Sequence, residues 1–188
     1  MVEKAIEFAT KAHEGQFRKG TTRPYIVHPL EVGRIVATMT EDEEIISAAI
    51  LHDTVEDCEG VTVERLAREF SDRVANLVAQ ESEDKSKSWH ERKSATIERL
   101  RTASHEVKLI GLADKLSNIR GILKDYQETG EAVWLKFRMK DKNIIGWYYE
   151  SIREAFEIVL ARSVEEYEFY TLKELFPKGF GPKNLKGE

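Results

Sequence analysis

The sequence predicts an all-α protein arranged as one helical bundle. Apolar residues recur at helical spacing in most segments, and no run of strict apolar and polar alternation predicts a strand. The composition, with 41% hydrophobic and 34% charged residues, is typical of a soluble globular protein. With 188 residues and neither repeats nor an interdomain linker, the chain is long enough for one domain and short for two. We expect one domain over residues 1–176 and a flexible tail over 177–188, where Pro, Gly and Lys leave little to bury.

The first helices are predicted from apolar stripes and helix-start signals. Apolar residues at helical spacing predict a first helix around residues 5–12. Pro29 stands where helices accept a first-turn proline, and we expect a helix over 30–39. Residues 40–43, Thr-Glu-Asp-Glu, have the pattern of a capping box. They open a helix that we expect to continue through residues 52–57.

The remaining helices are predicted from N-cap residues and periodicity. Thr62 and Ser71 each precede a segment with helical spacing and are expected to be N-caps. The expected helices are 63–70, 72–81, 89–103, 106–124 and the aromatic-rich segment 131–176, with loops at 82–88 and 125–130.

Charge and cysteine content exclude several classes of protein. The net charge of -5 argues against a general nucleic-acid binder. The single cysteine, Cys58, excludes a disulfide within the chain and fits a reducing compartment. The N-terminus lacks the apolar core of a secretory signal, and no apolar run approaches the roughly 18 residues of a membrane span. We therefore expect a cytoplasmic protein without nucleic-acid or membrane partners; the oligomeric state stays open, a homodimer included.

One histidine and three acids, in the sequence HDTVED, end an otherwise apolar helix at residues 52–57. On a helix with about 100° per residue, Glu56 lies about 40° from His52. Asp53 and Asp57 lie at about 100° and 140° from the same histidine. The apolar residues of the preceding turns fall in this arc, so the polar groups continue the buried stripe. Because buried ionised carboxylates are costly without a positive partner, the pattern favours a divalent cation over a helix end that emerges into water.

Two further residues are candidate ligands for the same cation. His28 lies in PYIVHP, where two prolines restrict the backbone on both sides. Asp114 interrupts the apolar helical segment LIGLADKL, where an acid is hard to explain as a surface residue. Together with His52 and Asp53 they would provide two nitrogens and two carboxylates, a set that suits Mn²⁺, Fe²⁺ or Zn²⁺. An octahedral ion such as Mn²⁺ would keep positions open for water and substrate.

Four stretches of the chain together resemble a known family. They are RKGTTRPYIVHP, AAILHDTVED, EDKSKSWHERK and LADKLSNIR. The order H…HD…D resembles the HD-domain phosphohydrolases, and the fuller pattern resembles the hydrolase domain of the RelA/SpoT homologue family, above all its stand-alone small alarmone hydrolases. The resemblance implies an HD domain that binds Mn²⁺ and removes the 3′-pyrophosphate of (p)ppGpp, giving GDP or GTP and pyrophosphate. Since the length leaves no room for a synthetase domain, we expect hydrolysis alone.

The resemblance also implies roles for individual residues. The metal ligands would be His28, His52, Asp53 and Asp114. Glu56 and Asp57, one helical turn after the HD pair, would activate or orient the attacking water. Arg18 would lie over the base. The other implied substrate contacts are Lys19, Asn118, Lys85, Arg92 and Lys93.

Two features of the sequence leave the choice of substrate open. The loop RKGTTRPYIVHP is one residue longer than the usual form, so Arg18 or Lys19 could take the stacking role. Gly121 follows Asn-Ile-Arg, where many family members have a threonine or an acid. Hydrolysis of (p)ppApp and removal of the 2′-phosphate of NADPH are therefore alternative activities of the same site. An alarmone-binding sensor is the non-enzyme alternative, although it would not need Glu56 and Asp57.

Overall fold

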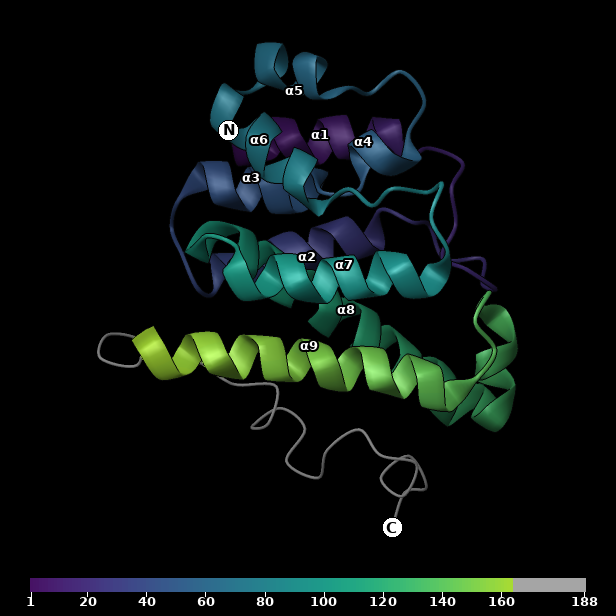
Figure 1. Cartoon of the computed structure of the whole chain (residues 1–188). Helices are drawn as coiled ribbons and strands as arrows, with labels where there is room; N and C mark the ends of the chain where they lie inside the picture. The colour runs from purple at the N-terminus through teal and green to yellow at the C-terminus, as the bar shows by residue number, and fades with distance from the viewer. Residues whose placement is uncertain (164–188) are drawn as a thin grey trace. The chain divides into compact units, whose positions relative to one another are not determined.

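The computed structural model describes residues 1–163, with side chains through residue 156 (Figure 1). Its elements in this range are helices, with one isolated bridge between Phe17 and Pro24 and no β-strand. The predicted all-α fold is confirmed. The predicted tail at 177–188 and the last part of the predicted helix, 164–176, lie outside the described residues. Within the described range, no helix is long and apolar enough to cross a membrane.

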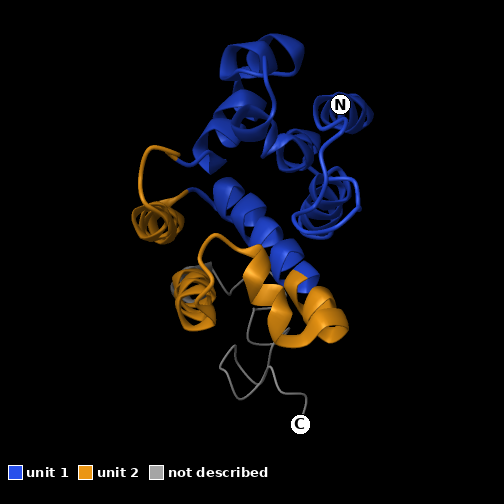
Figure 2. Cartoon of the chain, turned by 90° about the vertical axis from the view of Figure 1, so that its right-hand side faces the viewer, with its two compact units in different colours: residues 1–83, 104–121 blue, residues 84–103, 122–188 orange. Residues whose placement is uncertain are grey.

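The helices fall into two compact units (Figure 2). Unit 1 comprises Met1–Glu83 and Ser104–Gly121, and unit 2 comprises Asp84–Ala103 and Ile122–Glu188. The single domain predicted over 1–176 stays a prediction. The elements in chain order are α1 (Val2–Ala12), α2 (Val27–Ala37), α3 (Glu43–Leu51), α4 (Thr54–Asp57), α5 (Val63–Glu69), α6 (Asp72–Glu81), α7 (Trp89–Thr102), α8 (His105–Thr129), the 3-10 helix η1 (Gly130–Lys136) and α9 (Lys142–Ser163).

The start of α3 differs from the predicted capping box. The N-cap is Asp42, whose carboxylate accepts hydrogen bonds from the backbone N–H groups of Glu44 and Ile45. Thr40 instead accepts a hydrogen bond from the N–H of Asp42 at 3.1 Å. The aspartate prevails because its side chain reaches two of the backbone donors that a helix start leaves unpaired.

The end of α3 also differs from the prediction, because HDTVED does not lie on one continuous helix. α3 ends at Leu51, His52 and Asp53 form a turn, and the short helix α4 starts at Thr54. The backbone of this turn keeps α-helical dihedral angles, so the side chains still follow a helix-like rotation. Residues 52–57 are therefore divided between a turn and α4.

The other helix boundaries depend on caps and on packing. Thr62 and Ser71 cap α5 and α6 through their hydroxyl oxygens, as predicted. The loop predicted at 125–130 is wrong, since α8 continues to Thr129. Its last turns stay helical because Tyr126 packs against the apolar cluster of unit 2. The buried members of that cluster are Ile122, Val133, Trp134 and Ile145.

Helix α3 forms the centre of unit 1 and packs against α1, α2 and α6. It is apolar on nearly all sides, and its residues from Ser47 to Leu51 are buried. Burying each large side chain contributes about 1.5–3 kcal/mol. The contact with α2 is close at Gly33, where an added Cβ would lie 2.5 Å from Cγ1 of Ile50. This packing brings the first turn of α2 near the end of α3, where the polar residues begin.

Candidate metal centre

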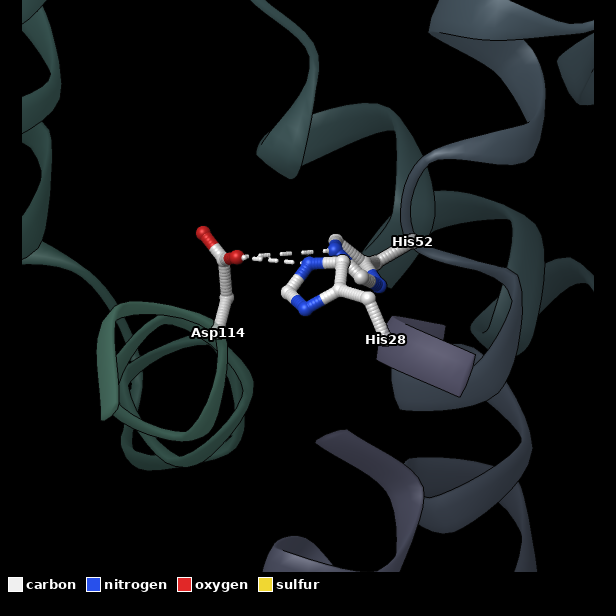
Figure 3. Close-up of side chains that lie close together, drawn as sticks. All are labelled: His28, His52 and Asp114. Atoms are coloured by element: carbon white, nitrogen blue, oxygen red, sulfur yellow. Dashed lines mark ion pairs between the residues drawn. The ribbon is translucent and has the colours of Figure 1, made fainter. Parts of the chain in front are cut away.

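Two histidines and one aspartate from three helical segments meet inside unit 1. His28 lies in the first turn of α2, His52 directly follows α3, and Asp114 lies within α8. All three are buried, and one ligand atom of each lies within 4.8 Å of the others. Figure 3 shows both imidazole rings directed at one carboxylate oxygen of Asp114. From this oxygen, Oδ1, Nε2 of His28 is 3.1 Å away and Nε2 of His52 is 3.7 Å away.

Asp53, the fourth predicted ligand, completes the cluster from the turn after α3. Its Oδ2 lies 3.1 Å from Nε2 of His52 and 3.7 Å from Nε2 of His28. The hydroxyl of Tyr25 donates a hydrogen bond to the same oxygen at 2.6 Å. All four predicted ligands therefore lie together, with two ring nitrogens and two carboxylate oxygens facing one region.

The hydrogen bonds of the imidazole rings suit a cation site. Nδ1 of His52 lies 2.8 Å from the carbonyl oxygen of Ala49, which can only accept, so this nitrogen carries a proton. Among the described residues, no hydrogen-bond partner of acceptable geometry is found for Nε2 of the same ring. A metal-ligating histidine commonly donates through its other ring nitrogen to a carbonyl or a carboxylate. The four side chains therefore fit a divalent cation bound by nitrogen and oxygen.

The electrostatics of the cluster favour a positive charge at its centre. Burial raises the pKa of Asp53, but His52 outweighs it and holds that pKa below the ordinary value. Burial likewise opposes ionisation of Asp114, whereas the adjacent Lys115 ammonium and the two histidines hold its pKa well below the usual range. Burial lowers the pKa of His28. For His52 the two carboxylates outweigh burial and raise the pKa. A divalent cation would supply the charge that these carboxylates attract.

Asp114 is held by two neighbours on α8, Asn118 and Lys115, of which Lys115 was not predicted from the sequence. Nδ2 of Asn118 donates to Oδ1 of Asp114 at 2.6 Å, and the Lys115 ammonium pairs with the other oxygen. Asn118 also accepts a hydrogen bond from the guanidinium of Arg18 at 2.9 Å. That guanidinium lies over the ring of Tyr25, 5.5 Å from its centroid. Arg18 and Asn118 thus adjoin the cluster, and Lys19 is exposed in the same loop.

The two acids predicted to act on water follow Asp53 on α4. Glu56 is half-buried, and its Oε2 accepts a hydrogen bond from the backbone N–H of Glu83 at 3.1 Å. Asp57 is exposed. The turn at His52 and Asp53 keeps α-helical dihedral angles, so the two acids follow Asp53 with a helix-like rotation.

Three predicted substrate contacts belong to unit 2. Lys85 is exposed before α7, whereas Arg92 and Lys93 are half-buried on α7. The ammonium of Lys93 lies over the ring of Tyr148, 5.1 Å from the centroid. Their roles toward a substrate stay predictions.

Three side chains that contact the metal-site residues were not predicted. Tyr25 binds Asp53, Lys115 pairs with Asp114, and Ser117 lies 2.8 Å from Nδ1 of His28. All three lie inside the motifs PYIVHP and LADKLSNIR. Their closeness in sequence to His28 and Asp114 was the signal that could have identified them. It was not sufficient, because the partners of Tyr25 and Ser117 lie on other segments and the pairing of Lys115 depends on its side-chain rotamer.

Comparison with known proteins identifies the family of the chain. Residues 5–140 match the HD domain family. The guanosine-3′,5′-bis(diphosphate) 3′-pyrophosphohydrolase MESH1 of Danio rerio is 37% identical over 157 residues, which are 81% of this chain and 76% of that protein. An enzyme of Vibrio cholerae with the same pyrophosphohydrolase name is 42% identical over 118 residues, 60% of this chain but 16% of its own length.

A solved structure shares the fold as well. It is described as a metazoan ortholog of SpoT that hydrolyses ppGpp, and it matches with a TM-score of 0.68 and 29% identity. The match covers 82% of this chain and 84% of the other. The resemblance to RelA/SpoT-type HD domains is confirmed. The chain belongs to the HD domain family, in the group that includes the MESH1 pyrophosphohydrolases.

Proposed function

We propose that this protein is a metal-dependent phosphohydrolase that removes the 3′-pyrophosphate of (p)ppGpp, giving GDP or GTP and pyrophosphate. The observation that carries the proposal is the convergence of His28, His52, Asp53 and Asp114 in unit 1. The family adds support, since relatives that share most of their length with this chain are named for this reaction. The proposed partner is a small-molecule nucleotide.

The proposed cation is Mn²⁺, bound by the two histidines and the two aspartates. The mixed nitrogen and oxygen donor set suits it, and four protein ligands leave positions for water and a phosphate oxygen. When bound, the ion would lower the pKa of water and neutralise charge on the phosphoryl group. The proposed location is the cytoplasm, in keeping with a chain whose single cysteine is a free thiol.

Glu56 and Asp57 are proposed to orient the attacking water and to receive its proton. They are the carboxylates that follow Asp53 on α4, and the backbone of Glu83 holds one oxygen of Glu56. The water oxygen would bond to the phosphorus attached to O3′. The bond from that phosphorus to O3′ would break, and O3′ would leave as the ribose hydroxyl after gaining a proton.

Arg18 and Asn118 are proposed to bind the nucleoside. The guanidinium of Arg18 is supported on one side by Tyr25 and at its edge by Asn118, which leaves a planar cation beside the cluster. Gly121 adds no side chain there, and a Cβ at this position would meet only Arg18, at 3.8 Å. Because no side chain at position 121 contacts the base, adenosine alarmones and NADPH stay alternative substrates in this proposal.

A hydrolysis panel tests the proposal. The full chain would be freed of metal, supplied with Mn²⁺, and given ppGpp, pppGpp, ppApp and NADPH in parallel, with pyrophosphate, phosphate and nucleotide products measured. We expect Mn²⁺-dependent release of pyrophosphate, fastest from the guanosine substrates. Asp53→Asn should abolish it, and Glu56→Ala should slow it by about 10²–10⁴-fold, as for the loss of a general base.

Each alternative has its own outcome in this panel. Equal or faster turnover of ppApp or NADPH would overturn the guanosine assignment. Full activity in Asp53→Asn would overturn the metal site. Binding of Mn²⁺ and ppGpp without release of pyrophosphate would identify a sensor.

A further inference from the structure

A buried serine of α8 connects a metal-site histidine of α2 to a glutamate that lies on α2 as well. Nδ1 of His28 lies 2.8 Å from Oγ of Ser117, and this hydroxyl donates a hydrogen bond to Oε2 of Glu31 at 2.9 Å. His28 and Ser117 are 2% and 3% exposed, so water does not compete for the contact. The three groups form one chain of hydrogen bonds between α2 and α8.

The direction of these hydrogen bonds follows from the proton count. A serine hydroxyl has one proton, and an ionised carboxylate can only accept. With the Ser117 proton directed at Glu31, the hydroxyl oxygen accepts from Nδ1–H of His28. In the reverse arrangement, the oxygens of Ser117 and Glu31 would face each other at 2.9 Å without a proton between them. The ring of His28 therefore carries a proton on Nδ1, which leaves Nε2, on the side of Asp114, as the nitrogen that can bind a cation.

We propose that Ser117 and Glu31 are positioning residues, which hold His28 in the tautomer able to bind a cation and thereby set the metal affinity of the site. The inference rests on the metal site of the proposed function, but not on its substrate. Neither residue touches the ligand atoms: each acts through the far side of the His28 ring.

Helix geometry makes the arrangement specific. His28 and Glu31 are three residues apart on α2, and Asp114 and Ser117 are three residues apart on α8, so each pair shares a helix face. The second oxygen of Glu31 lies 3.5 Å from the guanidinium of Arg120, which keeps the carboxylate over the serine. Each helix thus supplies one cation-binding group and one group that acts on the ring of His28.

A second buried serine provides the matched control. Ser47 of α3 is also fully buried in unit 1, but no hydrogen-bond partner is found for its hydroxyl among the described residues. Ser47→Ala removes the same atom from a comparable depth without touching the cluster. Arg34→Ala, at an exposed position of α2, is the matched control for Glu31→Ala.

The tautomer of His28 can be measured directly in the full chain without metal or nucleotide. Long-range proton–nitrogen correlation spectra distinguish Nδ1–H from Nε2–H rings, and loss of one ring signal in His28→Asn assigns the resonance. We expect a protonated Nδ1 in the wild type and in both controls. Glu31→Ala frees the serine proton to point at Nδ1, so it should shift His28 toward the Nε2–H form. A purely structural role for Glu31 would leave the tautomer unchanged.

Metal affinity gives the second measurement. Titration with Mn²⁺, with the free ion followed by electron paramagnetic resonance, should show about 10–100-fold weaker binding for Ser117→Ala and for Glu31→Ala. The variant with both Ser117→Ala and Glu31→Ala should bind Mn²⁺ with an affinity within a few-fold of that of Ser117→Ala alone, since both changes act through the Ser117 hydroxyl. The controls should bind as the wild type does.

Two results would overturn the inference: an unprotonated Nδ1 at His28 in the wild type, or wild-type Mn²⁺ affinity in the two variants. If Ser117→Ala does not fold, Glu31→Ala decides alone, because its side chain is 37% exposed and its loss leaves no buried cavity. A protein that binds Mn²⁺ as described but does not hydrolyse ppGpp would contradict the proposed function and leave this inference standing.

Discussion

Asn118 donates a hydrogen bond from Nδ2 to Oδ1 of Asp114 at 2.6 Å. The acceptor is the same oxygen that both metal-site histidines face. The carbonyl oxygen of this amide accepts a hydrogen bond from Arg18 at 2.9 Å. One side chain thus connects a proposed metal ligand with a proposed nucleotide contact.

Asn118→Ala should therefore affect both binding steps. Loss of the donor to Asp114 should weaken Mn²⁺ binding about 10-fold or more. Loss of the acceptor for Arg18 should raise the KM for ppGpp even at saturating Mn²⁺. Metal titration and steady-state kinetics measure the two effects, and Asn76→Ala, at an exposed site on α6, is the control. A variant in which KM rises but Mn²⁺ affinity is unchanged would contradict the link to Asp114.

Tyr25→Phe tests the hydrogen bond that holds Asp53. Its hydroxyl donates to Oδ2 of Asp53 at 2.6 Å, and burial, followed by this carboxylate, raises the pKa of Tyr25. A hydrogen bond to a charged group contributes about 1.5–3 kcal/mol, which corresponds to roughly 10–100-fold in metal affinity if the loss falls on the bound state. The phenylalanine ring can keep the contacts with His13 and His28, so the melting temperature should change little. Unchanged Mn²⁺ affinity would show that this hydroxyl does not position the aspartate.

Two helical glycines should respond in opposite ways to alanine. At Gly33 a new Cβ would lie 2.5 Å from Cγ1 of Ile50, and overpacking of this kind costs about 1–3 kcal/mol. At Gly121 the nearest atom would be the Arg18 guanidinium, at an ordinary 3.8 Å. Gly33→Ala should lower the free energy of unfolding, whereas Gly121→Ala should raise it by about 0.5–1 kcal/mol through helix propensity. Urea unfolding measures both, and a stabilising Gly33→Ala would refute the close approach of α2 and α3.

Arg73 joins three segments of unit 1 through carboxylates. Its guanidinium lies 2.7 Å from Asp42, 2.9 Å from Glu44 and 2.7 Å from Glu106. The hydrogen bond from Arg73 lowers the pKa of Asp42. The pKa of Glu44 is lowered mainly by a hydrogen bond from Ser71 and, to a smaller extent, by the hydrogen bond from Arg73. Since these side chains are about a third exposed, solvent screening limits the contribution to the order of 1 kcal/mol.

Arg73→Met should therefore destabilise the protein in a pH-dependent way. The pKa values of Asp42 and Glu44 are lower in the folded state than their unfolded values of about 4. The stabilisation is therefore complete above about pH 4 and is lost as the pH falls through the folded-state pKa values. The difference between wild type and variant in urea unfolding should be largest near neutrality and should shrink toward pH 3. Arg34→Met, at an exposed position of α2, should show no such difference. A gap that persists at pH 3 would point to packing rather than charge.

The sequence by itself determined the all-α class, most helices and the four side chains of the candidate metal centre. Helical spacing and caps such as Thr62 and Ser71 depend on neighbouring residues, so they can be read without the tertiary structure. His52 and Asp53 stood out because acids followed an apolar stretch, and Asp114 because an acid interrupted one.

The tertiary structure decided how those side chains are held. The turn at His52 and Asp53 interrupts the helix that was predicted to continue through residues 52–57, although its backbone keeps α-helical dihedral angles. Ser117 and Glu31 looked like ordinary helix residues, because their meeting with His28 requires α2 and α8 to lie side by side within unit 1. Local spacing determines which residues share a helix face, but only packing between segments distant in sequence determines which faces meet, and thus which hydrogen bond selects the ligand nitrogen of His28.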